Sequence, residues 1–170
     1  MTNLNLATKT IEIHSPAREV WQVLGRRFGD IGQWCATVNA SEAVLAGETV
    51  QGRECDTVFG NYVETFEHFD DAAMEMDYIA RSKKLPFFIQ HFTNSFRVRE
   101  LSENSSEVTM IAGAVMSQPF AFLMGFMMRM QVGKALEHQV EELKHFVEHG
   151  APHPRKIAAM QKHAREVLAQ

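Results

Sequence analysis

The feature that most constrains the fold is a long helix-forming segment late in the chain, from Pro119 to His149. Residues 120–128 are apolar on every side, so protein or another apolar material must cover this part of the helix. Residues 136–147 are amphipathic instead. The pattern predicts one long helix in the grip of a curved sheet, with space for an apolar ligand between them.

Runs of alternating polarity come before this helix and predict strands. The runs occupy residues 7–14, 39–46, 53–59, 61–69, 73–81, 88–100 and 107–116. The last six follow one another through short connections with turn residues, such as Ala46-Gly47-Glu48 and Phe59-Gly60-Asn61. Short connections join antiparallel neighbours, and uninterrupted strands exclude alternating βαβ units. We therefore expect an α+β fold with an antiparallel sheet of about seven strands.

Two short helices should separate the first strand from the other six. Ser15 can cap the first helix, and Pro16 suits its first position. The second helix should run from about Asp30 to Cys35. The expected order is therefore one strand, two helices, six strands and the long helix (β-αα-β6-α).

A break and a second helical segment follow the long helix. Pro152 and Pro154 cannot continue a helix, whereas residues 155–169 resume helical periodicity. We expect a single domain at 1–150 and a helical tail at 151–170. The tail could pack on the domain, mediate dimerisation or stay mobile.

Charge and composition exclude several classes of protein. The net charge is −4, and the tail is basic while the body is acidic, which argues against a nucleic-acid-binding surface. The longest apolar run, 119–128, is too short to span a bilayer, so no transmembrane segment is expected. The first residues lack the features of a signal peptide, which favours a cytoplasmic location. Cys35 and Cys55 fit neither a metal site nor a disulfide framework.

Four stretches, taken as an ordered set, resemble the START-like superfamily (SRPBCC) of helix-grip proteins. They are IEIHSPAREVW at 11–21, DIGQW at 30–34, VETFEHFDD at 63–71, and SFRV at 95–98 followed by EVTM at 107–110. The resemblance covers about residues 6–149 and is to the branch of polyketide cyclases/dehydratases and lipid-transport proteins. Plant abscisic-acid receptors and the birch-pollen allergen are more distant relatives. None of the stretches is a catalytic fingerprint. The resemblance implies that the sheet wraps the long helix and leaves a cavity between them.

Strand alternation and helical spacing predict which side chains face that cavity. From the strands they are Tyr62, Glu64, Phe66, His68, Met74, Met76, Tyr78, Gln90, Phe92, Asn94, Phe96, Met110 and Ala112. From the helix they are Met127, Gln131, Ala135 and Gln139. Apolar walls with sparse polar groups are typical of a small-molecule pocket. Resemblance to the hormone receptors also implies an inward Glu64, but their gating motif is absent, so hormone sensing is not implied.

Three hypotheses for function follow. The leading one is a protein that binds or carries a hydrophobic small molecule, such as a lipid, polyketide or isoprenoid-like compound, oriented by Glu64, Tyr78 and Asn94. The second is a cyclase or dehydratase without cofactor that uses Glu64 and His68 as acid/base groups. In the third, methionine and phenylalanine side chains fill the cavity, and the protein acts through its surface or tail.

Two further features have weaker chemical implications. His145 and His149 lie one helical turn apart, as do Glu141 and His145, a spacing that can hold a surface metal ion. A solvated helix face is the favoured interpretation, and we predict neither a metal site nor a cofactor. The Met/Phe-rich run 120–130 could instead be a surface patch for a membrane or a partner. A homodimer could form through this run or through the tail.

Overall fold

The computed structural model describes residues 1–169 and confirms the predicted α+β architecture. Strand β1 (Thr2–Ile13) leads into helix α1 (Ala17–Trp21), a π-helical turn η1 (Gln22–Arg26) and a 3-10 helix η2 (Phe28–Gln33). Six strands follow: β2 (Val38–Ala46), β3 (Thr49–Thr57), β4 (Gly60–Asp70), β5 (Glu75–Arg81), β6 (Ile89–Ser102) and β7 (Ser105–Met116). Helices α2 (Gln118–His149) and α3 (Pro154–Leu168) complete the described chain.

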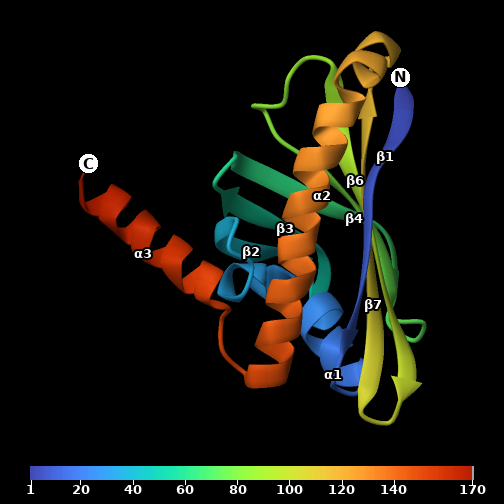
Figure 1. Cartoon of the computed structure of the whole chain (residues 1–170), viewed down its shortest axis with the longest axis vertical. Coiled ribbons are helices and arrows are strands. Elements are labelled where there is room, and N and C mark those ends of the chain that lie inside the picture. Colours follow the sequence, from blue (N-terminus) through green and yellow to red (C-terminus); the bar gives the residue numbers. More distant parts are fainter. Residues whose placement is uncertain (170) are drawn as a thin grey trace.

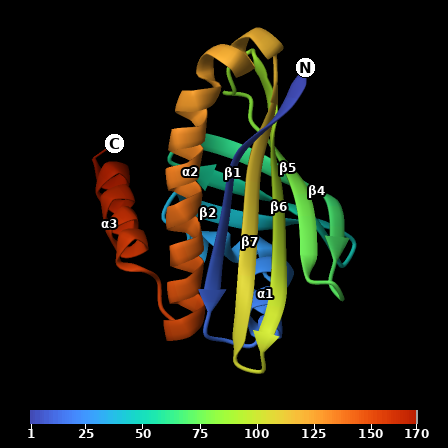
Figure 2. The ribbon, with the colours of Figure 1, turned by 45° about the vertical axis from the view of Figure 1, so that its right-hand side comes forward.

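The strands form one antiparallel sheet in the order β1-β7-β6-β5-β4-β3-β2. Helix α2 lies along one side of this sheet, and β1 runs beside it in both views (Figures 1 and 2). We call the side toward α2 the inner face and the opposite side the outer face. The sheet curves around α2, as the helix-grip fold requires.

The core fills the space between the inner face and α2. Alternate residues of β7, from Val108 to Met116, are buried there, which is the period of two expected of a half-buried strand. They meet a helical stripe of Met128, Leu136, Val140 and Leu143. This burial of apolar surface is the main force that holds α2 on the sheet.

The side of α2 that faces the sheet differs from the predicted side. Met127, Gln131 and Ala135 are exposed and Gln139 is half-buried, whereas the sheet-facing stripe begins one residue later at Met128. One residue is a rotation of about 100° around a helix axis. Because 120–128 is apolar all round, periodicity in that part could not determine which side meets the sheet.

The short helical elements after β1 close the lower end of the core in Figure 1. Trp21 and Phe28 are almost fully buried there. The Trp21 indole donates a hydrogen bond to Asp71 at 2.9 Å, and the Arg26 guanidinium donates two to the same carboxylate at 2.8 Å. This carboxylate therefore ties η1 to the β4–β5 turn.

The tail helix α3 is attached to the domain only near its start and then projects away from the sheet (Figure 1). The Lys156 ammonium is buried and donates to the Val38 carbonyl of β2 at 2.6 Å. Arg155 pairs with Glu141 and with the buried Glu142 of α2. The apolar side chains Ile157, Met160 and Leu168 of this helix remain exposed.

Candidate functional site

Two neighbouring cross-strand rows on the inner face bring most of the predicted polar residues together. The first row runs Arg53, Glu64, Ala80 and Phe92 across β3 to β6. The second runs Phe66, Tyr78, Asn94 and Ala112 across β4 to β7. Side chains directly opposite in an antiparallel sheet lie on the same face. Glu64, Tyr78 and Asn94 are therefore neighbours on the inner face.

The carboxylate of Glu64 forms an ion pair with Arg53, a partner that the sequence analysis missed. The Arg53 guanidinium also donates to the Phe28 carbonyl at 2.8 Å and lies 3.7 Å from the Phe28 ring centroid. Its side chain is 3% exposed, while that of Glu64 is 14% exposed. Burial, the largest single effect, would lower the pKa of Arg53, but the charge interactions with Glu64, Tyr78 and Cys55 and the hydrogen bond to Glu64 together outweigh it and raise the pKa. The pair is thus charged, with part of the carboxylate still accessible.

Gly52 makes this arrangement possible. A Cβ atom on Gly52 would overlap the backbone carbonyl of Glu64 in the adjacent strand. Glycine therefore allows β3 to approach β4 closely at the residue before Arg53.

Tyr78 and Asn94 supply the other polar groups of the inner face. They are paired residues on β5 and β6, yet no hydrogen bond joins them to each other or to another side chain in residues 1–169. Burial raises the pKa of the Tyr78 phenol well above its usual value, so the hydroxyl stays neutral. A neutral hydroxyl and an amide can each donate to and accept from a ligand.

Aromatic side chains surround these polar groups. Phe28 packs edge-on against Tyr78 and is tilted against Phe66, with ring centroids 5.1 and 4.6 Å apart. Tyr78 also packs edge-on against Phe96 at 5.3 Å. Tyr62, Phe66, Phe92 and Asn94 are half-buried, whereas Met76, Phe96 and Met110 are fully buried in the core. The inner face is thus filled in its lower part and accessible in its upper part.

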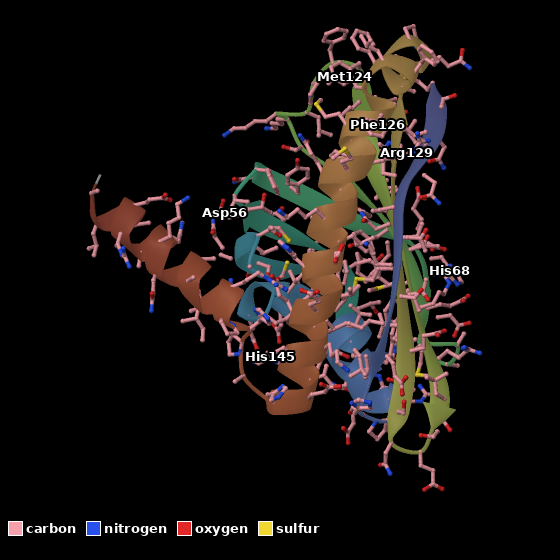
Figure 3. All side chains as sticks on the ribbon, viewed as in Figure 1. Asp56, His68, Met124, Phe126, Arg129 and His145 are labelled. Atoms are coloured by element: carbon pink, nitrogen blue, oxygen red, sulfur yellow. The ribbon has the colours of Figure 1, made fainter. Side chains whose placement is uncertain are left out.

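His68 lies on the outer face, in contrast to the prediction. A β-bulge interrupts the pairing between Phe66 and His68, so that His68 stands opposite the outward Asp77. Its imidazole lies 3.2 Å from Glu75, and Figure 3 shows it on the side of the sheet away from α2. Phe69 takes the inward position that strict alternation assigned to His68, and packs 5.5 Å from Trp21. The structure therefore does not assemble a Glu64–His68 acid/base pair.

Several other residues that were predicted to face the cavity lie elsewhere. A second bulge, between Ile89 and His91, leaves Gln90 exposed rather than inward. Met74 sits in the turn before β5 with a positive φ of 56° and is half-buried against the core. On α2, Met127, Gln131 and Ala135 are exposed, as described above.

Two hollows of the protein surface lie outside the space between sheet and α2. One, of about 880 Å³, is lined by β2, β3 and β4 and the start of the β5–β6 loop, and reaches Tyr62. The other, of about 480 Å³, is lined by outer-face residues that include His68 and Thr93, and also by Tyr78 and Asn94. Neither is lined by a residue of α2.

The two cysteines are poor nucleophiles. Both are buried, and burial raises the pKa of Cys55 to about 12 and that of Cys35 above its usual value. Because the thiolate is the reactive form, both thiols are inert at neutral pH.

Among the acidic and histidine side chains at the end of α2, Glu142 has a structural role. Glu142 is buried and accepts from the Ala36 amide at 2.8 Å and from Arg155 at 2.9 Å, so this part of the helix is not a solvated face. Within residues 1–169, no group of three His, Cys, Asp or Glu side chains has a geometry that could hold a metal ion.

Comparison with protein families and solved structures identifies the relatives of this fold. Residues 6–148 match the model of the family described as "Polyketide cyclase / dehydrase and lipid transport". No curated protein matches the sequence. A START superfamily protein from Mycobacterium smegmatis has a TM-score of 0.68 at 16% identity, covering 84% of this chain and 96% of its own. A protein from Bacillus thuringiensis has a TM-score of 0.66 at 20% identity, covering 86% and 98%.

The di-domain ARO/CYC protein BexL from the BE-7585A biosynthetic pathway also shares the fold. Its TM-score is 0.67 at 10% identity, and the match covers 86% of this chain and 47% of BexL. Identities this low establish a shared fold alone. The family match, in contrast, spans most of the chain, and the chain belongs to the polyketide cyclase/dehydrase and lipid transport family with the START-like helix-grip fold.

Proposed function

We propose that this protein binds a hydrophobic small molecule, such as a lipid, polyketide or isoprenoid-like compound, between the inner face and α2. The observation that supports the proposal is the pair of neighbouring polar side chains Tyr78 and Asn94, which have no side-chain hydrogen-bond partner within residues 1–169. Aromatic rings pack on Tyr78. A hydroxyl and an amide without a protein partner can each hydrogen-bond a polar group of a ligand. A ligand with one polar end would satisfy them and place its apolar part against the aromatic side chains.

Glu64 would serve as the third orienting group. Arg53 engages one of its oxygens, and the partial exposure of the side chain leaves the carboxylate accessible to a ligand hydroxyl. Apolar burial would provide most of the affinity, at roughly 25 cal/mol per Å² before the costs of association. Met128 and Met76 border the inner face, and their flexible side chains suit a site that must open around its ligand.

An enzyme of the cyclase or dehydratase type is the second candidate. The observation that favours it is the same accessible Glu64 carboxylate, which could transfer a proton to or from a substrate bound beside Tyr78. The pair with His68 does not contribute, because that imidazole lies on the outer face. Glu64→Gln would abolish turnover in an enzyme and would only change the affinity of a binding protein.

The test is native mass spectrometry of freshly purified protein, followed by organic extraction and identification of any released compound. We expect a defined hydrophobic compound that leaves on denaturation, and lower occupancy in a variant with Tyr78→Phe and Asn94→Leu. A clean apo mass together with no thermal shift against a panel of fatty acids, isoprenoids and aromatic polyketides would contradict the proposal. That result would favour the third hypothesis, in which core side chains fill the space permanently.

A further inference from the structure

One end of the molecule gathers an exposed apolar surface that the ligand site does not use. The N-terminal residues, the β5–β6 loop and the start of α2 meet at this end, at the top of Figures 1 and 2. Pairing of Met116 with both Thr2 and Ile89 joins them. We call residues 1–5, 82–92 and 115–131 the tip.

The first turns of α2 present large apolar side chains to solvent at the tip. Phe122, Leu123 and Phe126 are 95%, 77% and 75% exposed, and Phe87 of the β5–β6 loop is 86% exposed. Positions 122, 123 and 126 lie on one side of a helix, so they form a continuous face. Figure 3 shows Phe126 on this part of α2, above the sheet-facing core. Contiguous apolar surface of this kind marks an interaction site.

Packing holds the tip in a fixed shape. Phe88 stacks on Phe120 with ring centroids 4.5 Å apart, and Phe87 lies edge-on to Phe120 at 5.4 Å. These contacts pin the β5–β6 loop to the first turn of α2. The exposed side chains therefore project from a rigid support, and docking would cost little conformational entropy.

The charges of the tip are of one sign. The chain as a whole has 21 acidic residues and a net charge of −4, yet the tip contains no Asp or Glu. It does contain Lys83, Lys84 and Arg129. The flanking strands continue the pattern, because segments 1–11, 81–99 and 108–136 are also free of acidic residues. Acidic side chains of β2 and β3 lie beyond the tip, because Glu42, Glu54 and Asp56 line the same hollow as Lys83 and Lys84. The tip itself is basic and apolar, which is complementary to a surface that is negative and apolar.

We propose that the tip docks onto an anionic lipid bilayer. Phe122, Leu123 and Phe126 would enter the interface between head groups and acyl chains, while the neighbouring bases meet acidic head groups. A second copy of this chain is a poorer fit, because two tips of like charge would face each other. No helix in residues 1–169 is long and apolar enough to cross a membrane, so the contact is with the bilayer surface.

Docking would also bring the ligand site close to the lipid. Phe92 belongs to the tip and stands in the same cross-strand row as Glu64. A docked protein could exchange its hydrophobic ligand with the bilayer without passage through water. This last step rests on the proposed function, whereas docking itself does not.

Co-sedimentation with vesicles tests the proposal. We expect the protein to pellet with vesicles of phosphatidylcholine and phosphatidylglycerol (3:1), and to partition at least about tenfold less onto pure phosphatidylcholine. Raising the NaCl concentration to 0.5 M should weaken the anionic contribution. Phe122→Ser with Phe126→Ser should reduce partitioning by about tenfold or more, and Lys83→Glu with Lys84→Glu should remove the preference for anionic vesicles. The control is Leu168→Ser, an exposed change on α3 that should leave partitioning unchanged.

The outcomes separate docking from ligand binding. Failure to pellet, or equal pelleting on neutral and anionic vesicles, would overturn the proposal. A dimer in light scattering that Phe122→Ser dissolves, without vesicle binding, would also overturn it and identify a self-interface. Retention of an extractable ligand by the Phe122→Ser/Phe126→Ser variant, with vesicle binding lost, would support docking as a separate property. Vesicle binding by a protein that holds no ligand would support docking and count against the proposed function alone.

Discussion

Arg53 and Glu64 form an ion pair across β3 and β4, with the guanidinium stacked on the Phe28 ring and the carboxylate at the edge of the accessible inner face. A buried ion pair is costly to form, and hydrophobic residues of similar volume often replace one without loss of stability. Its position beside Tyr78 and Asn94 indicates that the pair positions a carboxylate for a ligand. The following predictions test this account of the site.

Removal of one partner should strongly destabilise the protein. Arg53→Met leaves a largely buried carboxylate without its counter-charge, so we expect the free energy of unfolding to fall by about 3–5 kcal/mol. Urea denaturation measures this change. Arg81→Met, at an exposed position on β5, is the matched control and should stay within about 0.5 kcal/mol of the wild type. A loss below about 1 kcal/mol for Arg53→Met would show that the pair is not a buried charge pair.

Tyr78→Phe should separate binding from stability. Because the Tyr78 hydroxyl has no side-chain partner in the part of the chain that the structure describes, its removal should change the free energy of unfolding of the ligand-free protein by less than about 1 kcal/mol. Affinity for the extracted ligand should fall by about tenfold, the value of one hydrogen bond. Calorimetric titration of both proteins measures the affinity. A large loss of stability with unchanged affinity would assign the hydroxyl a structural role instead.

The β-bulge in β4 places the adjacent residues His68 and Phe69 on opposite faces, so their substitution should affect stability differently. His68→Ala removes an exposed outer-face side chain and should cost less than about 1 kcal/mol, with ligand binding unchanged. Phe69→Ala removes a ring that packs on Trp21 and Phe66 but is 39% exposed, so it should cost about 1–2 kcal/mol, more than His68→Ala. Thermal and urea unfolding compare the two. If His68→Ala abolished ligand binding or turnover, our placement of His68 would be wrong.

Asp71 should make stability depend on pH in the acid range. Hydrogen bonds from Arg26 and then from Trp21 lower the pKa of Asp71 below its usual value. A lowered pKa in the folded state stabilises the protein above the ordinary Asp pKa of about 3.9, and this contribution disappears as the pH falls through the folded-state pKa. The stability difference between wild type and Asp71→Asn should therefore be constant from pH 5 to 8 and shrink below about pH 4. Glu103→Gln in the β6–β7 turn is the control, and a difference that does not vary with pH would refute the linkage.

The order of elements could be predicted from sequence because periodicity and turn chemistry act locally. The change from a period of two to a helical period near Pro119 is decided by residues within one segment, and the structure places α2 from Gln118 to His149. The same holds for the existence and order of the strands, although β1 begins at Thr2 and β3 at Thr49, five and four residues before the predicted runs.

Site details that depend on partners from other segments could not be predicted in this way. One extra residue at Glu67 reverses the faces of His68 and Phe69, and nothing in a strand's own alternation signals a bulge. Arg53 reaches Glu64 only because β3 pairs with β4 in one particular register. Gly52 lies just before the predicted run 53–59, whereas the observed strand includes it, and a glycine inside a strand often marks close backbone approach. The prediction of which side of α2 faces the sheet was wrong for a different reason. Residues 120–128 are apolar on every side, so their pattern does not favour one side.

Methyl NMR of the ten methionines tests the central claim most directly, because they lie on the sheet and on α2 beside the proposed site and also at positions away from it. Met110 and Met128 border the inner face from the sheet and from α2, Met127 and Met130 are exposed on α2, and Met160 lies on α3. On titration with the compound extracted from the protein, in the absence of lipid, the account predicts saturable shifts of Met110 and Met128 while Met160 stays fixed. Shifts confined to Met127 and Met130, with Met110 and Met128 unmoved, would contradict binding between the sheet and α2.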